Sequence, residues 1–247
     1  MEHLPDLRSP VLCLRMALIG IASLAIATVA MIAVDYFFPA WTLLGQISAL
    51  CVALLVIRQF FQQRSRLKAR FGKMAYRHAF LTYVLTGAPV IFAAIAHTAY
   101  LPGDRVVTGS LAVVISAVIV YLMTSGVVIW GRAVFAFGAD NLALVYVYFP
   151  EKGRIVDSSI YALIRHPAYS GVLRFGMALG LWHGTWSSIA FALLMPVGMT
   201  VWLKLVEEPE LIERFGEGYA AYRRAVPAFA PRLRDVGKFW RFLVYGK

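Results

Sequence analysis

The sequence predicts an all-α protein, a polytopic transmembrane helical bundle with five to six spans. The first reason is composition: the 247 residues are 60% hydrophobic and 15% charged, and their mean hydropathy is +0.70, far above that of a typical soluble domain. The second reason is that several apolar runs reach the roughly 20 residues that a helix needs to cross a hydrocarbon core of about 30 Å. The third is that the cations gather in a few segments between these runs.

Four apolar runs are each predicted to form one membrane-spanning helix. They cover residues 11–34, 41–57, 79–99 and 108–130. Arg15, near the start of the first run, can extend its guanidinium group to the interface. No small-residue cleavage site follows a short apolar core there, so we predict a retained anchor rather than a signal peptide.

A fifth apolar region, residues 171–203, is too long for one comfortable span. It is interrupted at 183–188 by HGTWSS, a polar stretch with glycine that is typical of a break between helices. We expect two short helices that form a hairpin, with one long helix as the alternative.

The distribution of cations predicts the orientation in the membrane. The loop between the second and third spans carries Arg58, Arg64, Arg66, Lys68, Arg70, Lys73 and Arg77, whereas residues 35–40 and 100–107 together carry Arg105 alone. The positive-inside rule places the first of these loops in the cytoplasm, and counting spans places residues 131–170 and the segment after 204 on the same side. Topology and anionic headgroups account for the net charge of +11, so no nucleic-acid partner is expected.

Polar residues concentrate at both ends of the predicted hairpin. LIRHPAYSG, residues 163–171, precedes it. Pro167 suits the first turn of a helix, where its missing N–H costs nothing. The free amides of that turn, beside Arg165 and His166, suit a bound anion.

Two adjacent carboxylates, Glu207 and Glu208, follow the hairpin. Pro209 is then predicted to open a cytoplasmic amphipathic helix, because Leu211, Phe215, Tyr219 and Tyr222 recur at helical spacing. Because the two ends of a hairpin meet, we expect the glutamates to lie close to the RHPAY stretch and to share one pocket with it.

Each of these residues also has a simpler explanation. Arg165 with His166 can be an interfacial cation before a helix start, and the two glutamates can be a solvated helix end. Tyr161 and Tyr169 can be interfacial aromatics, and Arg132 can be a topogenic charge. The spacing of all of them together favours a functional site.

No metal site or disulfide is predicted. Cys13 and Cys51 both lie in apolar runs without a partner motif, so they are expected to be packing residues. His97 and His183 lack the spacing of metal ligands and are also expected to be packing or interfacial residues.

The motifs together resemble those of the isoprenylcysteine carboxyl methyltransferase and phospholipid methyltransferase superfamily of integral membrane methyltransferases. The resemblance covers roughly residues 130–232. Its elements are RHPAYSG at 165–171, the glutamate pair, FG at 215–216, YAAY at 219–222 and VP at 226–227.

The resemblance implies an enzyme that transfers a methyl group from S-adenosylmethionine to a lipid or another hydrophobic acceptor, with a small thiol also compatible. It implies cofactor binding by Tyr161, Arg165, His166, Tyr169, Glu207 and Glu208. Arg132 matches an arginine that faces the acceptor, and His166 is a candidate proton acceptor; we therefore expect catalytic roles for both. Leu203 stands where the family often has arginine, which leaves a carboxylate acceptor open to question.

The expected domain organisation is three N-terminal spans in residues 1–107 and a methyltransferase core with its cofactor pocket in 108–247. The expected location is the bacterial inner membrane, with the active site facing the cytoplasm. Two other functions stay open: an NADPH-dependent sterol or steroid reductase, which shares part of the motif, and a non-enzymatic scaffold or transporter.

Overall fold

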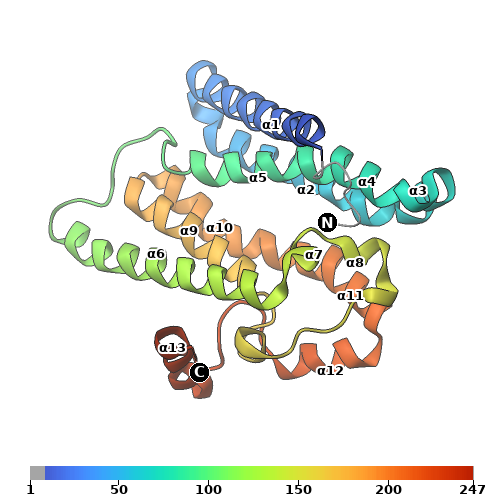
Figure 1. Cartoon of the computed structure of the whole chain (residues 1–247). Coiled ribbons are helices and arrows are strands. Elements are labelled where there is room, and N and C mark those ends of the chain that lie inside the picture. The colour runs from blue at the N-terminus through green and yellow to red at the C-terminus, as the bar shows by residue number, and fades with distance from the viewer. Residues whose placement is uncertain (1–8, 247) are drawn as a thin grey trace. The chain divides into compact units, whose positions relative to one another are not determined.

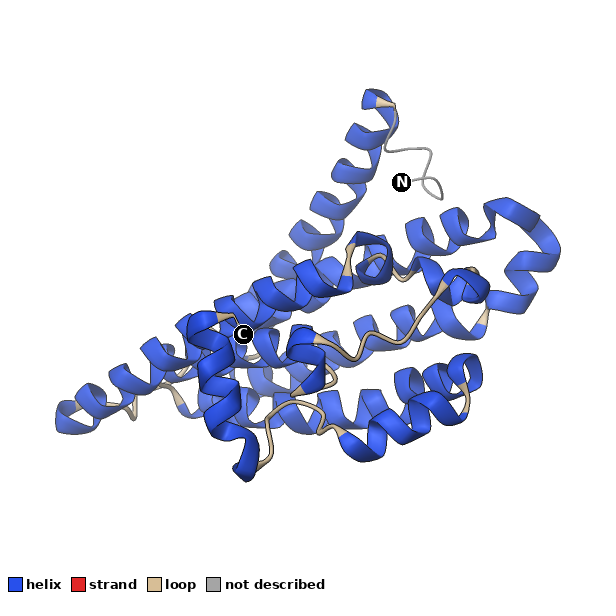
Figure 2. Ribbon diagram, turned by 60° about the horizontal axis from the view of Figure 1, so that its bottom comes forward, coloured by secondary structure: helices blue, strands red, loops and turns tan. Residues whose placement is uncertain are grey.

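The protein is all-helical, as the sequence predicts. The computed structural model describes residues 9–246, and Figure 2 shows helices and loops but no strand within that range. Five helical segments of the described chain are long and apolar enough to cross a membrane: Pro10–Phe37, Pro39–Gln62, Arg64–His97, Gly109–Phe137 and Trp186–Phe215. These features confirm a polytopic membrane protein, whereas the side that faces the cytoplasm stays a prediction.

The chain forms two compact units. The N-terminal unit contains the chain up to Val106 and the short segment His183–Phe191, and the second unit contains Val107–Trp182 and Ala192–Lys247. The site residues that the sequence singles out all lie in the second unit.

The N-terminal unit is built on three long helices, labelled in Figure 1. These are α1 (Pro10–Phe37), α2 (Thr42–Gln62) and α5 (Leu85–His97). The shorter helices α3 (Arg64–Phe71) and α4 (Ala75–Ala79) precede α5, which a π-helical turn at Phe80–Val84 joins to α4. Helices α1 and α5 share a buried cluster in which Ala27 and Met31 of α1 pack against Ala93 and Ala94 of α5.

The predicted hairpin region consists of two helices, α9 (Pro167–His183) and α10 (Trp186–Trp202). Gly184, with φ of +73°, ends α9 in the left-handed region that glycine tolerates best. Thr185 then caps α10: the Ser188 amide donates to its Oγ1 at 3.2 Å, and the Thr185 amide donates to Ser188 Oγ at 3.0 Å. The expected break into two helices is therefore confirmed, but the second helix is not short because it continues to Phe215.

The second unit contains α6 and the C-terminal helices. They are α6 (Gly109–Phe137), α7 (Ala139–Leu142), α8 (Val145–Tyr148), α11 (Glu208–Phe215), α12 (Glu217–Ala225) and α13 (Val236–Tyr245). Helices α6 and α9 lie in close contact, because a Cβ on Gly171 would come within 2.8 Å of the Trp130 Cβ and 3.0 Å of the Gly126 carbonyl oxygen.

Several predicted boundaries are wrong, and two of them bear on the site. Helix α6 continues past Trp130 to Phe137 because AVFAF extends the apolar face, and it ends where Gly138 adopts φ of +81°. Pro209 opens no separate helix, because α10 runs through a π-helical turn at Leu203–Glu207 into α11. The predicted amphipathic helix instead breaks at Gly216, where φ is +59°.

Candidate functional site

The start of α9 is held by a C-terminal segment, residues 226–229, which we call the strap. The amide of Arg165 donates to the Pro227 carbonyl at 2.9 Å, and the amide of His166 donates to the Ala228 carbonyl at 3.0 Å. One turn into α9, Ser170 Oγ donates to the Phe229 carbonyl at 2.6 Å. These bonds fix the backbone of the RHPAY stretch and so fix the direction of its side chains.

The glutamate pair approaches the same stretch from the junction of α10 and α11. Glu207 is the last residue of the π-helical turn and Glu208 is the first residue of α11. Neighbouring residues on a helix point about 100° apart, so the two carboxylates reach different partners. A π-helical turn is a common feature of functional sites because it alters the direction of side chains.

Glu208 forms the principal ion pair of the site. Arg165 donates through Nε at 2.9 Å and approaches through Nη2 at 2.7 Å, both toward Glu208 Oε1. The remaining nitrogen, Nη1, donates to the strap at the Val226 carbonyl, 2.5 Å away. Both side chains of the pair are largely buried. One guanidinium group therefore joins the α9 start, the α11 start and the strap.

Glu207 is bound by α9 and by its own helix. Tyr169 Oη donates to Glu207 Oε2 at 2.6 Å, and Trp202 Nε1 donates to the same oxygen at 3.4 Å. The predicted convergence of the two polar ends of the hairpin is thus present in the structure.

His166 lies between the two carboxylates. Its Nδ1 is 3.5 Å from Glu207 Oε1 and its Nε2 is 3.5 Å from Glu208 Oε1. Burial lowers the pKa of His166, but the two carboxylates outweigh burial and raise the pKa above its ordinary value. The two carboxylates thus favour the protonated form of the imidazole that lies between them. Nε2 is buried and has no hydrogen-bond partner.

Tyrosines surround this group of charges. Tyr161 is buried with its ring stacked on Phe137 at 5.2 Å between centroids, and Tyr222 Oη donates to the Tyr161 carbonyl at 2.7 Å. The Tyr219 hydroxyl is buried without a hydrogen-bond partner. Burial raises the pKa of Tyr219, so this hydroxyl is neutral and free to donate.

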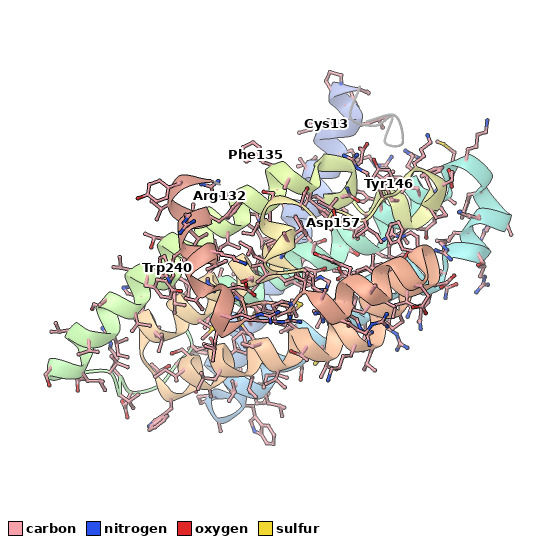
Figure 3. All side chains as sticks on the ribbon, turned by 90° about the horizontal axis from the view of Figure 1, so that it is seen from below. Cys13, Arg132, Phe135, Tyr146, Asp157 and Trp240 are labelled. Atoms are coloured by element: carbon pink, nitrogen blue, oxygen red, sulfur yellow. The ribbon has the colours of Figure 1, made fainter. Side chains whose placement is uncertain are left out.

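Arg132 is placed against a different element. Its Nη2 donates to the Leu243 carbonyl at 3.3 Å, and its guanidinium lies 4.9 Å from the centre of the Phe242 ring. Figure 3 shows Arg132 beside α13, the helix that carries the labelled Trp240. The contacts of Arg132 are thus with the last turn of α13, where a cation is favoured by the helix dipole, and none of them is with the glutamate pair.

The sequence does not indicate several contacts of the site. Trp202 and Arg223 contact Glu207 and Glu208 respectively, the latter at 3.5 Å. The strap contributes backbone carbonyls, which any residue carries. Aromatic and basic residues are frequent throughout this chain, so neither Trp202 nor Arg223 stands out by type. Within residues 9–246, no group of three or more His, Cys, Asp or Glu side chains is arranged to hold a metal ion.

The comparisons with known proteins concern this same part of the chain. Residues 112–218 match the model of the family described as phospholipid methyltransferase. This segment, less than half of the chain, is similar to that family, and we call it the phospholipid methyltransferase segment. A curated methanethiol S-methyltransferase from Crocosphaera subtropica (strain ATCC 51142 / BH68) is 34% identical over 100 residues, 38% of this chain and 38% of that relative. The chain thus spans little more than a third of that relative's length.

The resemblance predicted from the motifs is confirmed, and both matches support a methyltransferase enzyme. The phospholipid methyltransferase segment contains Arg165, His166, Tyr169 and the glutamate pair, whereas the strap follows it. No solved structure matches the chain.

Proposed function

We propose that the protein is an integral membrane methyltransferase that uses S-adenosylmethionine and methylates a lipid or another hydrophobic acceptor. The observation that carries this proposal is the meeting of Arg165, His166 and Tyr169 with Glu207 and Glu208 inside the phospholipid methyltransferase segment. Two of these five groups, His166 and Glu208, are buried and the others are partly buried. Burying charged groups costs free energy unless each keeps a partner, and a scaffold has no need of such a cluster.

The residues of the site fit S-adenosylmethionine by their chemistry. This cofactor presents two ribose hydroxyls and an ammonium group, which donate hydrogen bonds that Glu207 and Glu208 can accept. Two further polar atoms, His166 Nε2 and the Tyr219 hydroxyl, are buried without a hydrogen-bond partner. The ring of Tyr169 lies 5.9 Å from His166 and offers a face for the adenine. Binding would exchange contacts within the cluster for contacts with the ligand.

S-adenosylmethionine, when bound, supplies a methyl group on a positively charged sulfur, and its transfer needs alignment and exclusion of water more than a metal or a covalent intermediate. The role proposed for His166 follows from its setting. The carboxylates on both sides favour the protonated imidazole, and in that form it does not accept a proton from the acceptor. We therefore assign His166 to positioning the glutamates for the cofactor.

The acceptor is proposed to be hydrophobic and to enter from the bilayer. The similarity to a methanethiol S-methyltransferase supports a small thiol as one member of this class. Arg132 is proposed to face the acceptor. In the present structure its guanidinium is held by α13, so this helix would contribute to the acceptor side of the site.

The proposed location is the bacterial inner membrane with the site facing the cytoplasm. The cation-rich segment 58–77 supports this orientation by the positive-inside rule. S-adenosylmethionine is made in the cytoplasm, and a site on that side has direct access to it.

Calorimetry on the purified full chain tests the cofactor assignment. S-adenosylhomocysteine is expected to bind and NADPH is not, and the opposite result would favour a membrane reductase. Glu208→Gln removes one charge at nearly unchanged shape and should weaken S-adenosylhomocysteine binding at least tenfold. Glu217→Gln is the matched control, because Glu217 is 92% exposed. This variant should bind S-adenosylhomocysteine as the unmodified chain does. Equal binding by both variants would remove Glu208 from the site.

Methyl-transfer assays on the reconstituted protein test the acceptor class. A small alkyl thiol, a prenylated cysteine and an amine-headed phospholipid are offered separately with S-adenosylmethionine. The proposal requires that at least one of these is methylated. Arg132→Gln should keep the affinity for S-adenosylhomocysteine and lower turnover, whereas unchanged turnover would contradict its proposed role.

A further inference from the structure

Three polar side chains, two of them buried and Asp35 partly buried, contact one another in the N-terminal unit. Asp35 lies near the end of α1, Gln46 near the start of α2 and His97 at the end of α5. His97 Nε2 is 2.8 Å from Asp35 Oδ2, and His97 Nδ1 is 2.8 Å from Gln46 Oε1. The amide nitrogen of Gln46 donates to the Ala94 carbonyl. His97, predicted to be a packing or interfacial residue, is buried and contacts Asp35.

The hydrogen bonds fix where the protons lie. The Ala94 carbonyl can only accept, so Gln46 must direct its NH₂ group there and its Oε1 toward His97. Oε1 can also only accept, so His97 Nδ1 carries a proton. His97 Nε2 lies 2.8 Å from Asp35 Oδ2 without the geometry of a hydrogen bond, and one further proton on either atom makes the pair neutral. Whichever of the two atoms holds it, the pair as a whole is neutral, which is the form that a low-dielectric setting favours.

Two atoms of this cluster lack a hydrogen-bond partner, His97 Nε2 and Asp35 Oδ1. Asp35 Oδ1 is buried and has no hydrogen-bond partner. In either position of the shared proton, Oδ1 is an acceptor. An unsatisfied buried acceptor typically costs about 1–3 kcal/mol, so a group that donates to it would be bound favourably.

Asp35 and His97 line the end of a groove in the same unit. The groove has a volume of about 400 Å³, which lies within the range of small-molecule sites. Its wall on α1 runs from Ser23 to Asp35, a length of about 18 Å at about 1.5 Å per residue. Most of the wall is apolar, and Ile26 and Val52 on its rim are exposed. The groove is therefore open on the side of the helices that lipid would cover.

We propose that this groove binds a single-chain amphiphile with a neutral hydroxyl head, such as a long-chain alcohol, whose hydrocarbon chain follows α1 and whose hydroxyl donates to Asp35. Binding would require the buried Oδ1 to turn toward the groove that Asp35 lines. This site is separate from the proposed methyltransferase site and does not depend on it.

The charge balance selects the head group. A primary ammonium would add an unpaired positive charge to a neutral pair, and a carboxylate would add a negative charge next to Asp35; both are costly in the membrane. An ether or a hydrocarbon lacks a donor and leaves Oδ1 unsatisfied. A hydroxyl group supplies the donor without adding charge.

Photolabelling of the full chain in phosphatidylcholine nanodiscs tests the proposal. The probes are a straight-chain primary alcohol with a mid-chain diazirine, its methyl ether and the corresponding primary amine, and labelled peptides are identified by mass spectrometry. The alcohol should label the α1 and α2 groove peptides about threefold to tenfold more than the ether, as one hydrogen bond predicts. Equal labelling by alcohol and ether, or stronger labelling by the amine, would overturn the assignment of the head group.

Matched variants separate the groove from general lipid contact. Ala30→Phe fills the groove and should abolish preferential labelling, whereas Ala25→Phe, at an exposed position of α1 outside the groove, should not. Asp35→Asn should keep the preference for the alcohol, because its NH₂ can donate to His97 Nε2 and its oxygen still accepts. Asp35→Leu should lose the preference. If Asp35→Asn folds but loses the preference for the alcohol, charge and not hydrogen bonding selects the ligand.

Discussion

Among the cations of the site, Arg165 should contribute most to the free energy of unfolding, and Arg165→Ala tests this. Its guanidinium group makes two contacts with Glu208 Oε1, at 2.9 and 2.7 Å, and one with the Val226 carbonyl. The side chains of the pair are 14% and 5% exposed, so solvent screens the pair little. Removing one partner of a buried ion pair costs about 3–5 kcal/mol because it leaves an uncompensated charge. Since Arg223 and His166 are still 3.5 Å from Glu208, we expect about 3 kcal/mol.

Arg223→Ala is the matched control. Arg223 also reaches Glu208, but at 3.5 Å and with a side chain that is 44% exposed. Exposed pairs contribute about 0–1 kcal/mol, so the free energy of unfolding should fall by less than about 1 kcal/mol. The double variant Arg165→Ala with Glu208→Gln should lose less than the sum of its two single changes, because the charge that Arg165 neutralises is gone.

The measurement is the free energy of unfolding in mixed micelles, followed by tryptophan fluorescence as SDS is titrated. Thiol-reactive dyes are unsuitable because Cys13 and Cys51 are both exposed in the folded chain. Equal losses for Arg165→Ala and Arg223→Ala, or a loss below about 1 kcal/mol for Arg165→Ala, would refute the view that Arg165 joins the elements of the site.

Three other predictions concern the neighbourhood of the site. The raised pKa of His166 means that its contribution to stability is complete below about pH 6.5 and is lost as the pH rises through the higher value of the folded state; the melting temperature should fall over that range, and His166→Gln should flatten the profile. Gly171→Ala should lower the melting temperature because its Cβ would clash with α6, whereas Gly198→Ala, with open space around its Cβ, should not. Tyr222→Phe removes the hydrogen bond to the Tyr161 carbonyl and should cost about 0.5–1.5 kcal/mol of unfolding free energy.

The principal contacts of the site could be predicted because they follow from chain reversal. Once HGTWSS is recognised as a break, residues just before α9 and just after α10 must lie near one another. The ion pair of Arg165 with Glu208 and the hydrogen bond of Tyr169 to Glu207 follow from that geometry. Chain reversal does not predict that Glu207 and Glu208 have different partners. The π-helical turn that ends at Glu207 sets the direction of each carboxylate, and single-residue propensities do not predict such turns.

Other features depend on backbone groups or on distant residues. The strap binds Arg165 and His166 through carbonyls, and a carbonyl has no signature in the sequence. The ion pair of Asp35 with His97 joins the ends of two different helices, so neither residue signals its partner locally. The predicted fourth span ends too early, at residue 130, because Arg132 interrupts the apolar run. An arginine near a helix end can extend its charged group away from the apolar face, so the helix continues past it.

The extended α6 changes what Arg132 can do. Because the helix continues to Phe137, Arg132 lies within its last turns, where its guanidinium group meets the C-terminal end of α13. An arginine that is held by a helix end and a ring can turn to a negatively charged or polar acceptor only if α13 moves or if the acceptor replaces the Leu243 carbonyl. The acceptor step should therefore depend on α13. Gly246 gives that helix its end, with φ of +75°, so Gly246→Val should disturb turnover with little effect on S-adenosylhomocysteine affinity. A loss of affinity equal to the loss of turnover would instead place α13 on the cofactor side of the site.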